Sequence, residues 1–509
     1  MGGLRVTVGV ALRAAVPPPH FPLPALPLAC RVMRLPVLLL AVSLSCLAED
    51  DIPRIESGVD VLKAGQAVIE ALRPEREVAG KPWAGDLAAL SNPTRDIAQR
   101  GIRSLVQRGQ VVLPDLEVLA HDIDPLVRTR VAEVVMGIGG TAATPLAILQ
   151  SQDEEPRVRE LAALGLGRCQ GDAVRPRLEA MLDEKRSEVR TAAAAALGLT
   201  GEVAALGPLL RADTEPDSLA QRAMTDSVAR LVARPEAVPV VIDLLARESG
   251  GRRDVLLTAL LTVTDPRLCP ALLTLVRPAQ GIPEAPPGGR LKGQPQAWTT
   301  WLALRALATN GDSRAWEALC QIAADAPNTE LRETAAATMR ALSGWQTGAG
   351  KTWQVWWSDH ATEAAARIPL DTFLASLRDP TAPVSRAELA AFSPDQLMPL
   401  VDAALGRTGW WAARALQALR ADDPARWSQP LLARYTTSTL ALERIGLVLI
   451  VATLSGPAAA DTLTAMRAHL EALASRELAQ ADDQGRVPPD HGAERAAFPT
   501  LTQHAHAKP

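Results

Sequence analysis

The chain has 509 residues, of which 48% are hydrophobic but only 3% aromatic. A core of this composition consists mainly of Ala, Leu and Val, which suits closely packed helices and lacks the β-branched and aromatic enrichment of strands. The formal net charge is −4. These figures favour an all-α protein, and they argue against nucleic acid as a partner, because proteins that bind it carry a concentrated basic surface.

The first 48 residues have the form of an export signal. They contain four Arg and no acidic residue, and they end in the apolar run 35–44 followed by small residues. This pattern predicts cleavage after Ala48 and a periplasmic or extracellular protein, with Met33 as a candidate start. The run is shorter than the roughly 20 apolar residues of a transmembrane helix. Lipid attachment at Cys46 is the alternative to cleavage after Ala48.

Processing would leave three cysteines and a net charge of about −8, which again argues against nucleic acid. Cys169, Cys269 and Cys320 are widely spaced and odd in number. They therefore predict buried thiols rather than a disulfide framework.

After an expected helical cap over 49–91, two sets of residues recur every 31 positions. A period in this range predicts helical hairpins that bury their apolar faces only by stacking, which gives an α-α superhelix, also called a solenoid. We expect such repeats over 92–278. The recurring residues are the acids Asp122, Asp153 and Glu184 and the pairs Val127-Arg128, Val158-Arg159 and Val189-Arg190.

The hairpin that follows Asp122 illustrates how each repeat should form. Asp124 supplies a helix cap, and Pro125 occupies the first helical position, where a missing amide costs nothing. Four valines then fall on one helical face, and glycines between 137 and 140 end the helix. A second, antiparallel helix should begin near Pro145.

Beyond these repeats the pattern becomes less regular. The segment 279–297 is rich in Pro and Gly and predicts an insertion loop. Helical repeats should resume over 298–368 and end in a Trp-rich helix, and 369–478 predicts degenerate helical repeats without a clean period. The polar segment 479–509 predicts a disordered tail.

These features resemble the HEAT-repeat superfamily, in particular the short HEAT-like repeats shared with phycobilin lyase subunits and abundant in exported bacterial proteins. The resemblance rests on the openings from Asp122 to Arg128 and from Asp153 to Arg159 and on Ala-rich first helices. A second similarity is the Leu-Ser-Gly run at Leu342 followed by a Trp-x-x-Trp-Trp pattern from Trp353. The resemblance implies a superhelix of antiparallel helix pairs and brings no catalytic residue.

Seven of the 11 tryptophans lie between Trp298 and Trp357. They could line an aromatic groove for a peptide, sugar or cation, or they could plug the end of the stacked repeats. Helical spacing favours the plug, because large aromatic residues at this spacing are usually core. If a binding site exists, we expect it at this segment with the adjoining loop, at Trp345, Trp353, Trp356 and Trp357.

Arg128, Arg159 and Arg190 could bind anions, but the acids that recur with them favour ion pairs between stacked repeats. The run Gly350-Lys351-Thr352 resembles the end of a phosphate-binding loop, yet Trp345 stands where that loop requires Gly. The scattered His residues predict no metal site, and no motif frames a catalytic serine. We therefore expect neither an enzyme nor a cofactor.

Together these observations predict a non-catalytic protein-interaction scaffold of the bacterial cell envelope. An unknown protein partner would bind a concave face formed mainly by the second helix of each pair. One alternative is a subunit that acts like a cofactor or chromophore lyase or chaperone. A second is carbohydrate or envelope-polymer binding by the Trp-rich segment.

Overall fold

The structure is a computed structural model. It describes residues 80–284, 291–344, 352–406, 409–454, 456–484, 491–496 and 498. Over these residues the chain forms α-helices joined by short 3₁₀-helices and turns, and no strand, as the all-α prediction requires. No helix in these ranges is both long enough and apolar enough to cross a membrane. The predicted export signal lies outside them, and so does the predicted cap before residue 80.

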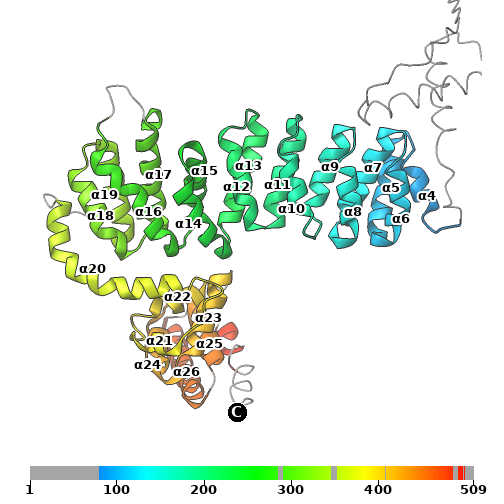
Figure 1. The fold of residues 1–509 in the computed structure, drawn as a ribbon. Coiled ribbons are helices and arrows are strands. Elements are labelled where there is room, and N and C mark those ends of the chain that lie inside the picture. Colours follow the sequence, from blue (N-terminus) through cyan, green and yellow to red (C-terminus); the bar gives the residue numbers. More distant parts are fainter. Residues whose placement is uncertain are drawn as a thin grey trace, which may run out of the picture. The chain divides into compact units, whose positions relative to one another are not determined.

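The helices up to residue 376 form the array (Figure 1). Its α-helices are α4 (Ala84–Ala89), α5 (Arg95–Arg108), α6 (Leu113–Leu119), α7 (Pro125–Ile138), α8 (Gly140–Gln150), α9 (Pro156–Leu166), α10 (Val174–Met181), α11 (Ser187–Thr200), α12 (Leu206–Leu209), α13 (Ser218–Val232), α14 (Val238–Arg247), α15 (Gly250–Leu260), α16 (Cys269–Val276), α17 (Pro295–Asn310), α18 (Trp316–Asp325), α19 (Thr329–Ser343) and α20 (Trp353–Ser376). Its 3₁₀-helices are η2 (Gly109–Val112), η3 (Val203–Ala205), η4 (Leu210–Asp213), η5 (Pro235–Ala237), η6 (Pro266–Leu268), η7 (Arg277–Gly281), η8 (Leu291–Gly293) and η9 (Ser313–Ala315).

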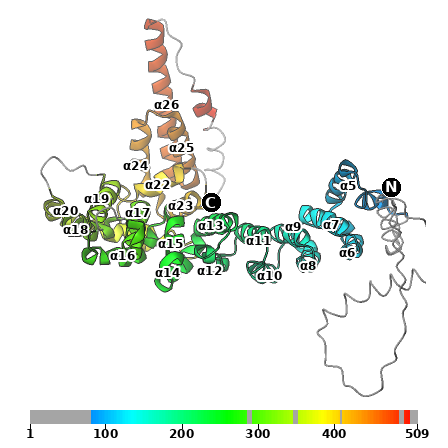
Figure 2. The ribbon, with the colours of Figure 1, turned by 90° about the horizontal axis from the view of Figure 1, so that it is seen from above.

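The array consists of hairpins whose first and second helices form two rows, which Figure 2 shows from above. The first helices, from α5 through α7, α9, α11, α13, α15 and α17 to α19, each contact the next in the row. Their sequences permit this close packing. A Cβ on Gly198 of α11 would lie only 2.5 Å from the Ser227 Oγ atom of α13. Small residues therefore let neighbouring repeats approach, and the apolar side chains between the rows form one continuous core.

Local sequence sets where the first helices begin and end. The Asp124 side chain accepts the Leu126 backbone N–H at the start of α7, and Pro125 follows as the first helical residue. At the other end of a first helix, Gly201 follows α11 with φ +73°, a left-handed conformation that glycine adopts without strain. The start of α7 thus agrees with the prediction, whereas the second helix begins at Gly140, not near Pro145, which lies inside α8.

Helix α20 links two hydrophobic cores. Its first half buries Trp353, Trp356 and Ala364 in the core of the array, and its second half buries Phe373 in a separate core formed with α21–α26. The predicted boundary at 368/369 therefore falls inside a continuous helix. Pro369 removes one backbone donor, but apolar contacts on both sides of it keep the helix intact.

The C-terminal bundle, as we call the helices after α20, packs around Trp427 and Tyr435, both fully buried. It contains α21 (Arg386–Ala390), α22 (Met398–Leu405), α23 (Trp410–Ala421), α24 (Pro424–Thr437), α25 (Ala441–Leu454) and α26 (Pro457–Gln484).

Two predicted boundaries differ from the structure. Helix α26 continues to Gln484, and Glu494 and Phe498 are buried against the bundle, so the part of 479–509 that the structure describes is ordered. The cause is a non-local contact, because Arg444 of α25 pairs with Glu494 at 2.7 Å. Within the predicted loop 279–297, η7 and η8 form and α17 already begins at Pro295.

Candidate functional site

The recurring arginines form a ladder of ion pairs along the array. Arg128 Nε lies 2.8 Å from Asp153 Oδ2, Arg159 Nη2 lies 3.1 Å from Glu184 Oε2, and Arg190 Nη2 lies 2.6 Å from Glu215 Oε1. Each arginine thus reaches the acid of the following repeat, 25 positions later. The third acid, Glu215, opens the next repeat but is not among the acids of the predicted ladder, because that repeat lacks a following Val-Arg pair.

Each rung also holds the opening of its own helix. Arg190 Nη1 donates to the Glu184 backbone carbonyl at 2.7 Å, and Glu215 Oε1 accepts the Asp217 backbone N–H at 3.0 Å. The hydrogen bond from Arg190 holds the pKa of the Glu215 carboxyl below its ordinary value. Because these groups are paired with one another, the ladder is a structural element that sets the register of the repeats.

The tryptophans of α20 lie in the core. Trp356 is 2% exposed and stacks on His360 with a centroid distance of 4.2 Å, and Trp316 of α18 meets it edge-on at 5.8 Å. Trp353 is 7% exposed and Trp357 is half-buried against the same cluster. The rings of Trp353 and Trp356 are thus packed in the core, whereas binding at these residues stays a prediction. Trp345 lies outside the described residues.

Two other tryptophans reach the surface, on the row of first helices. Trp298 and Trp301 of α17 stack with centroids 4.8 Å apart, and the Arg305 guanidinium lies 4.9 Å from the Trp301 ring. Trp301 and Arg305 border a hollow of about 520 Å³ opposite the exposed acids Glu330 and Glu333 of α19. We call this hollow the Trp301 groove. It combines an aromatic face with charges of both signs.

The floor of the Trp301 groove is made of small side chains, which is why α17 and α19 leave a hollow between them. Ala308, Thr334, Ala337 and Thr338 line it, and the Thr338 hydroxyl donates to the Leu304 carbonyl at 2.9 Å. The described stem of the insertion loop lies at the start of α19, since the Glu284 carboxylate accepts the Thr329 backbone N–H at 2.7 Å. Helical spacing alone does not separate Trp301 from the buried tryptophans.

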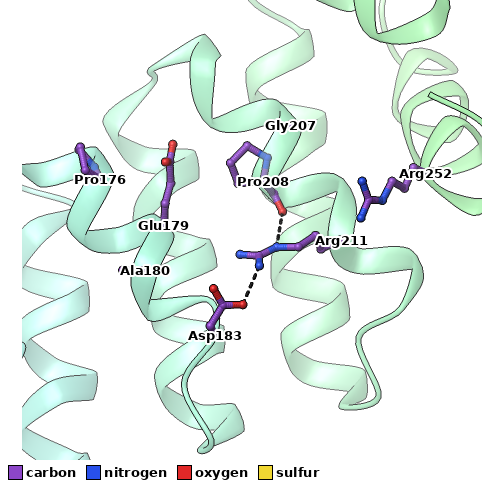
Figure 3. A pocket seen from close by; sticks show the side chains of 8 residues that line it. All are labelled: Pro176, Glu179, Ala180, Asp183, Gly207, Pro208, Arg211 and Arg252. Atoms are coloured by element: carbon purple, nitrogen blue, oxygen red, sulfur yellow. Dashed lines mark hydrogen bonds and ion pairs between the residues drawn. The ribbon is translucent and has the colours of Figure 1, made fainter. Parts of the chain in front are cut away.

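A second hollow, of about 500 Å³, lies over α10, α12 and α15 (Figure 3). Its basic side chains are engaged with acids. Arg211 Nη1 donates to Asp183 at 2.6 Å, and Arg252 lies 3.8 Å from Glu248. Paired charges on an open surface of this kind are typical of a solvated face.

Metal ligation and thiol chemistry find no support in the described part of the chain. No group of three or more His, Cys, Asp or Glu within it could hold a metal ion. The three cysteines are buried and unpaired, and burial raises the pKa of Cys269 and of Cys320 to about 12. Thiols in such surroundings are poor nucleophiles at neutral pH.

Comparison with known families identifies the repeats. The family described as HEAT repeats matches residues 143–229, which span the second and third rungs of the ladder. Residues 143–229 are thus HEAT repeats. The hairpins on either side of the HEAT segment stack on it in the same two rows. No curated protein matches the sequence.

The solved structures that resemble this chain are distant from it in sequence. Kap121p bound to Ste12p is 11% identical with a TM-score of 0.32, over 94% of this chain and 57% of that one. An engineered protein is 14% identical, with a TM-score of 0.29 over 82% and 97% of the two chains. A chain from work on cadherin and beta-catenin is 12% identical, with a TM-score of 0.27 over 82% and 98%. This chain spans little more than half of Kap121p. Sequence identities and TM-scores as low as these support no conclusion about function.

Proposed function

We propose that the protein is a non-catalytic interaction scaffold of the cell envelope, and that it binds a segment of a partner protein in the Trp301 groove. The fold supports the first part, because stacked helical hairpins provide long surfaces suited to extended chains. The export pattern of residues 1–48 supports the location. The single observation that carries the binding site is the half-buried Trp301 with the exposed Arg305 beside two exposed acids, Glu330 and Glu333.

Residue chemistry favours this groove over the rest of the array. Trp and Arg are the side chains that contribute most to protein interfaces when they lie at the centre of a contact. In the Trp301 groove Arg305 is exposed and Trp301 is half-buried, whereas the arginines of the ladder and of the hollow in Figure 3 are engaged with acids. The binding face in this proposal therefore lies on the first helices, although the sequence prediction places it on the second.

Site-specific crosslinking tests the proposal. The protein is expressed from Met33 in a bacterial host with an envelope, with a photoreactive amino acid at Thr334 of the groove or, as a control, at Ile242 of α14. We expect one partner protein to be captured from Thr334 and not from Ile242, and a mature chain that begins at Glu49. Capture should be lost in Trp301→Ala, and because Trp301 also packs against the core, the melting temperature of this variant is measured alongside.

Other results would contradict the proposal at separate points. Equal capture from Thr334 and Ile242 would show that the partner does not bind specifically in the Trp301 groove. An intact, uncleaved chain in the cytoplasm would contradict the proposed export to the cell envelope. Retention of a polysaccharide, with no protein captured, would favour the polymer-binding alternative.

A further inference from the structure

A second cleft lies where the array meets the C-terminal bundle. Two adjoining hollows of about 390 Å³ and 230 Å³ share three lining residues, Thr264, Arg378 and Trp411. Arg378 comes from the turn after α20, Thr264 from the turn before η6, and Trp411 from α23. We call this the junction cleft. It touches the Trp301 groove only through Thr309, which lines a hollow of each.

Arg378 differs from Arg267 and Arg314 because no carboxylate pairs with it at contact distance within the described residues, although Asp265 lies near enough to favour its charge. Arg267 forms a short ion pair with Asp265, and Arg314 does the same with Asp312. Within the described residues Arg378 forms no ion pair, and its hydrogen bond goes to the Thr264 carbonyl oxygen. Its guanidinium lies 4.6 Å from the Trp411 ring. A guanidinium has five N–H donors, so most of them remain available to the cleft.

The surroundings of Arg378 disfavour an uncompensated positive charge. Burial lowers the pKa of the Arg378 guanidinium, and this effect prevails although Asp265 nearby acts to raise that pKa; Arg267 acts to lower it. A second cation, Arg234, lines the larger hollow and also has no ion pair among the described residues. The lining thus holds two arginines without an ion pair beside three aspartates, two of which, Asp265 and Asp312, are paired with Arg267 and Arg314.

We propose that the junction cleft binds a carboxylate of an acidic, apolar peptide segment, with Arg378 as its anchor and Trp410, Trp411 and Val238 as apolar walls. The planar fork of Arg matches a carboxylate, and a bidentate contact would replace the water that Arg378 loses by burial. A phosphate dianion fits less well. Asp265, Asp312 and Asp371 also line the cleft and would repel a second negative charge.

Calorimetric titration of the full chain with matched short peptides tests this site. The probes are acetyl-Leu-Asp-Leu-amide, its Asn counterpart, its phosphoserine counterpart, and acetyl-Leu-Leu with a free terminal carboxylate. We expect the Asp peptide to bind about tenfold more tightly than the Asn peptide. The phosphoserine peptide should bind no more tightly than the Asp peptide. The terminal carboxylate distinguishes a chain end from a side chain as the natural source.

Substitutions assign the preference to the cleft. Arg378→Met should abolish the difference between the Asp and Asn peptides, Arg378→Lys should retain part of it, and Trp301→Ala should leave it unchanged. Because Arg378 also joins two parts of the fold, Arg234→Met gives a milder test, in which the Asp peptide should bind a few-fold more weakly. Equal binding of the Asp and Asn peptides, or a preference that survives Arg378→Met, would overturn the proposal without affecting the Trp301 groove.

Discussion

The ladder repeats and the C-terminal bundle use different contacts to hold helices of similar length. From α7 to α13 each repeat contacts its neighbours, the buried core contains only Val, Leu, Ala, Met and Cys, and each ion pair of the ladder joins positions 25 apart. The bundle buries Trp427 and Tyr435 and joins α25 to a residue 50 positions away through Arg444 and Glu494. The array is therefore stabilised by contacts between adjacent units, whereas the bundle depends on contacts distant in sequence.

One device is common to both regions. Arg190, Arg332 and Arg444 each donate through Nη1 to the backbone carbonyl six residues earlier, at 2.7, 2.6 and 2.9 Å. In each case the carbonyl lies just before the first turn of the helix that carries the arginine. The hydrogen bond forms whether the acid that the arginine also contacts is 25 or 50 positions away, or is absent among the described residues, as for Arg332. The group that the other guanidinium nitrogens contact differs: it is Glu215 for Arg190, Thr329 for Arg332 and Glu494 for Arg444. The comparison can be tested by removing one contact of each kind.

The largest effect should come from Trp427→Ala in the bundle. Trp427 is fully buried and its indole N–H donates to Asp422 at 3.0 Å. Its loss should lower the free energy of unfolding by about 3–5 kcal/mol. Hydrogen exchange should show loss of protection in α23–α25 and unchanged protection in α7–α13. Equal loss in both regions would mean that they unfold as one unit.

A smaller effect is expected where two first helices approach most closely. The Cβ of Gly198→Ala would lie 2.5 Å from the Ser227 hydroxyl, which itself donates to the Ala194 carbonyl. We expect destabilisation of about 1–3 kcal/mol, measured by urea unfolding. The control is Gly207→Ala, which meets nothing within 4 Å and should be nearly neutral. If both variants were neutral, close packing of the first helices would not limit the array.

The smallest effect should come from one rung of the ladder. Glu215→Gln removes the charge that Arg190 contacts and should cost about 1 kcal/mol at pH 7. Asp183→Asn is the control, because that ion pair lies on the open surface, where such pairs contribute little. A loss as large for Asp183→Asn would mean that surface charge in general, and not the ladder, stabilises the repeats.

The pH dependence of the Glu215 variant has a defined direction. Because the pKa of Glu215 is lowered in the folded state, the ion pair contributes fully above the ordinary carboxyl pKa of about 4.3. That contribution is lost as the pH falls through the lowered folded-state pKa. The difference in stability between the original protein and Glu215→Gln should therefore shrink towards zero on acidification. A difference that persists at low pH would contradict the assignment.

Sequence reasoning works best where contacts are local and repeated. The 31-residue register predicts the stacked hairpins, because each Val-Arg pair reports the same position in successive helices. The helical spacing of the tryptophans favours a buried Trp356. The same spacing does not distinguish Trp356 from Trp301, which is only half-buried. Sequence reasoning misses the junction cleft, because Thr264, Arg378 and Trp411 come together only through the fold. The ordered segment near Glu494 is missed for the same reason.

The membership of α20 in two cores has a practical consequence for fragments of this protein. A fragment that stops at residue 343 would leave the Trp316 side of α18 exposed to water, and one that begins at residue 370 would lack the turns of α20 that precede Phe373. Either fragment should be prone to aggregate, because it presents apolar surface that the intact helix covers. A fragment of the array should therefore end after Ser376, with Phe373 changed to a polar residue.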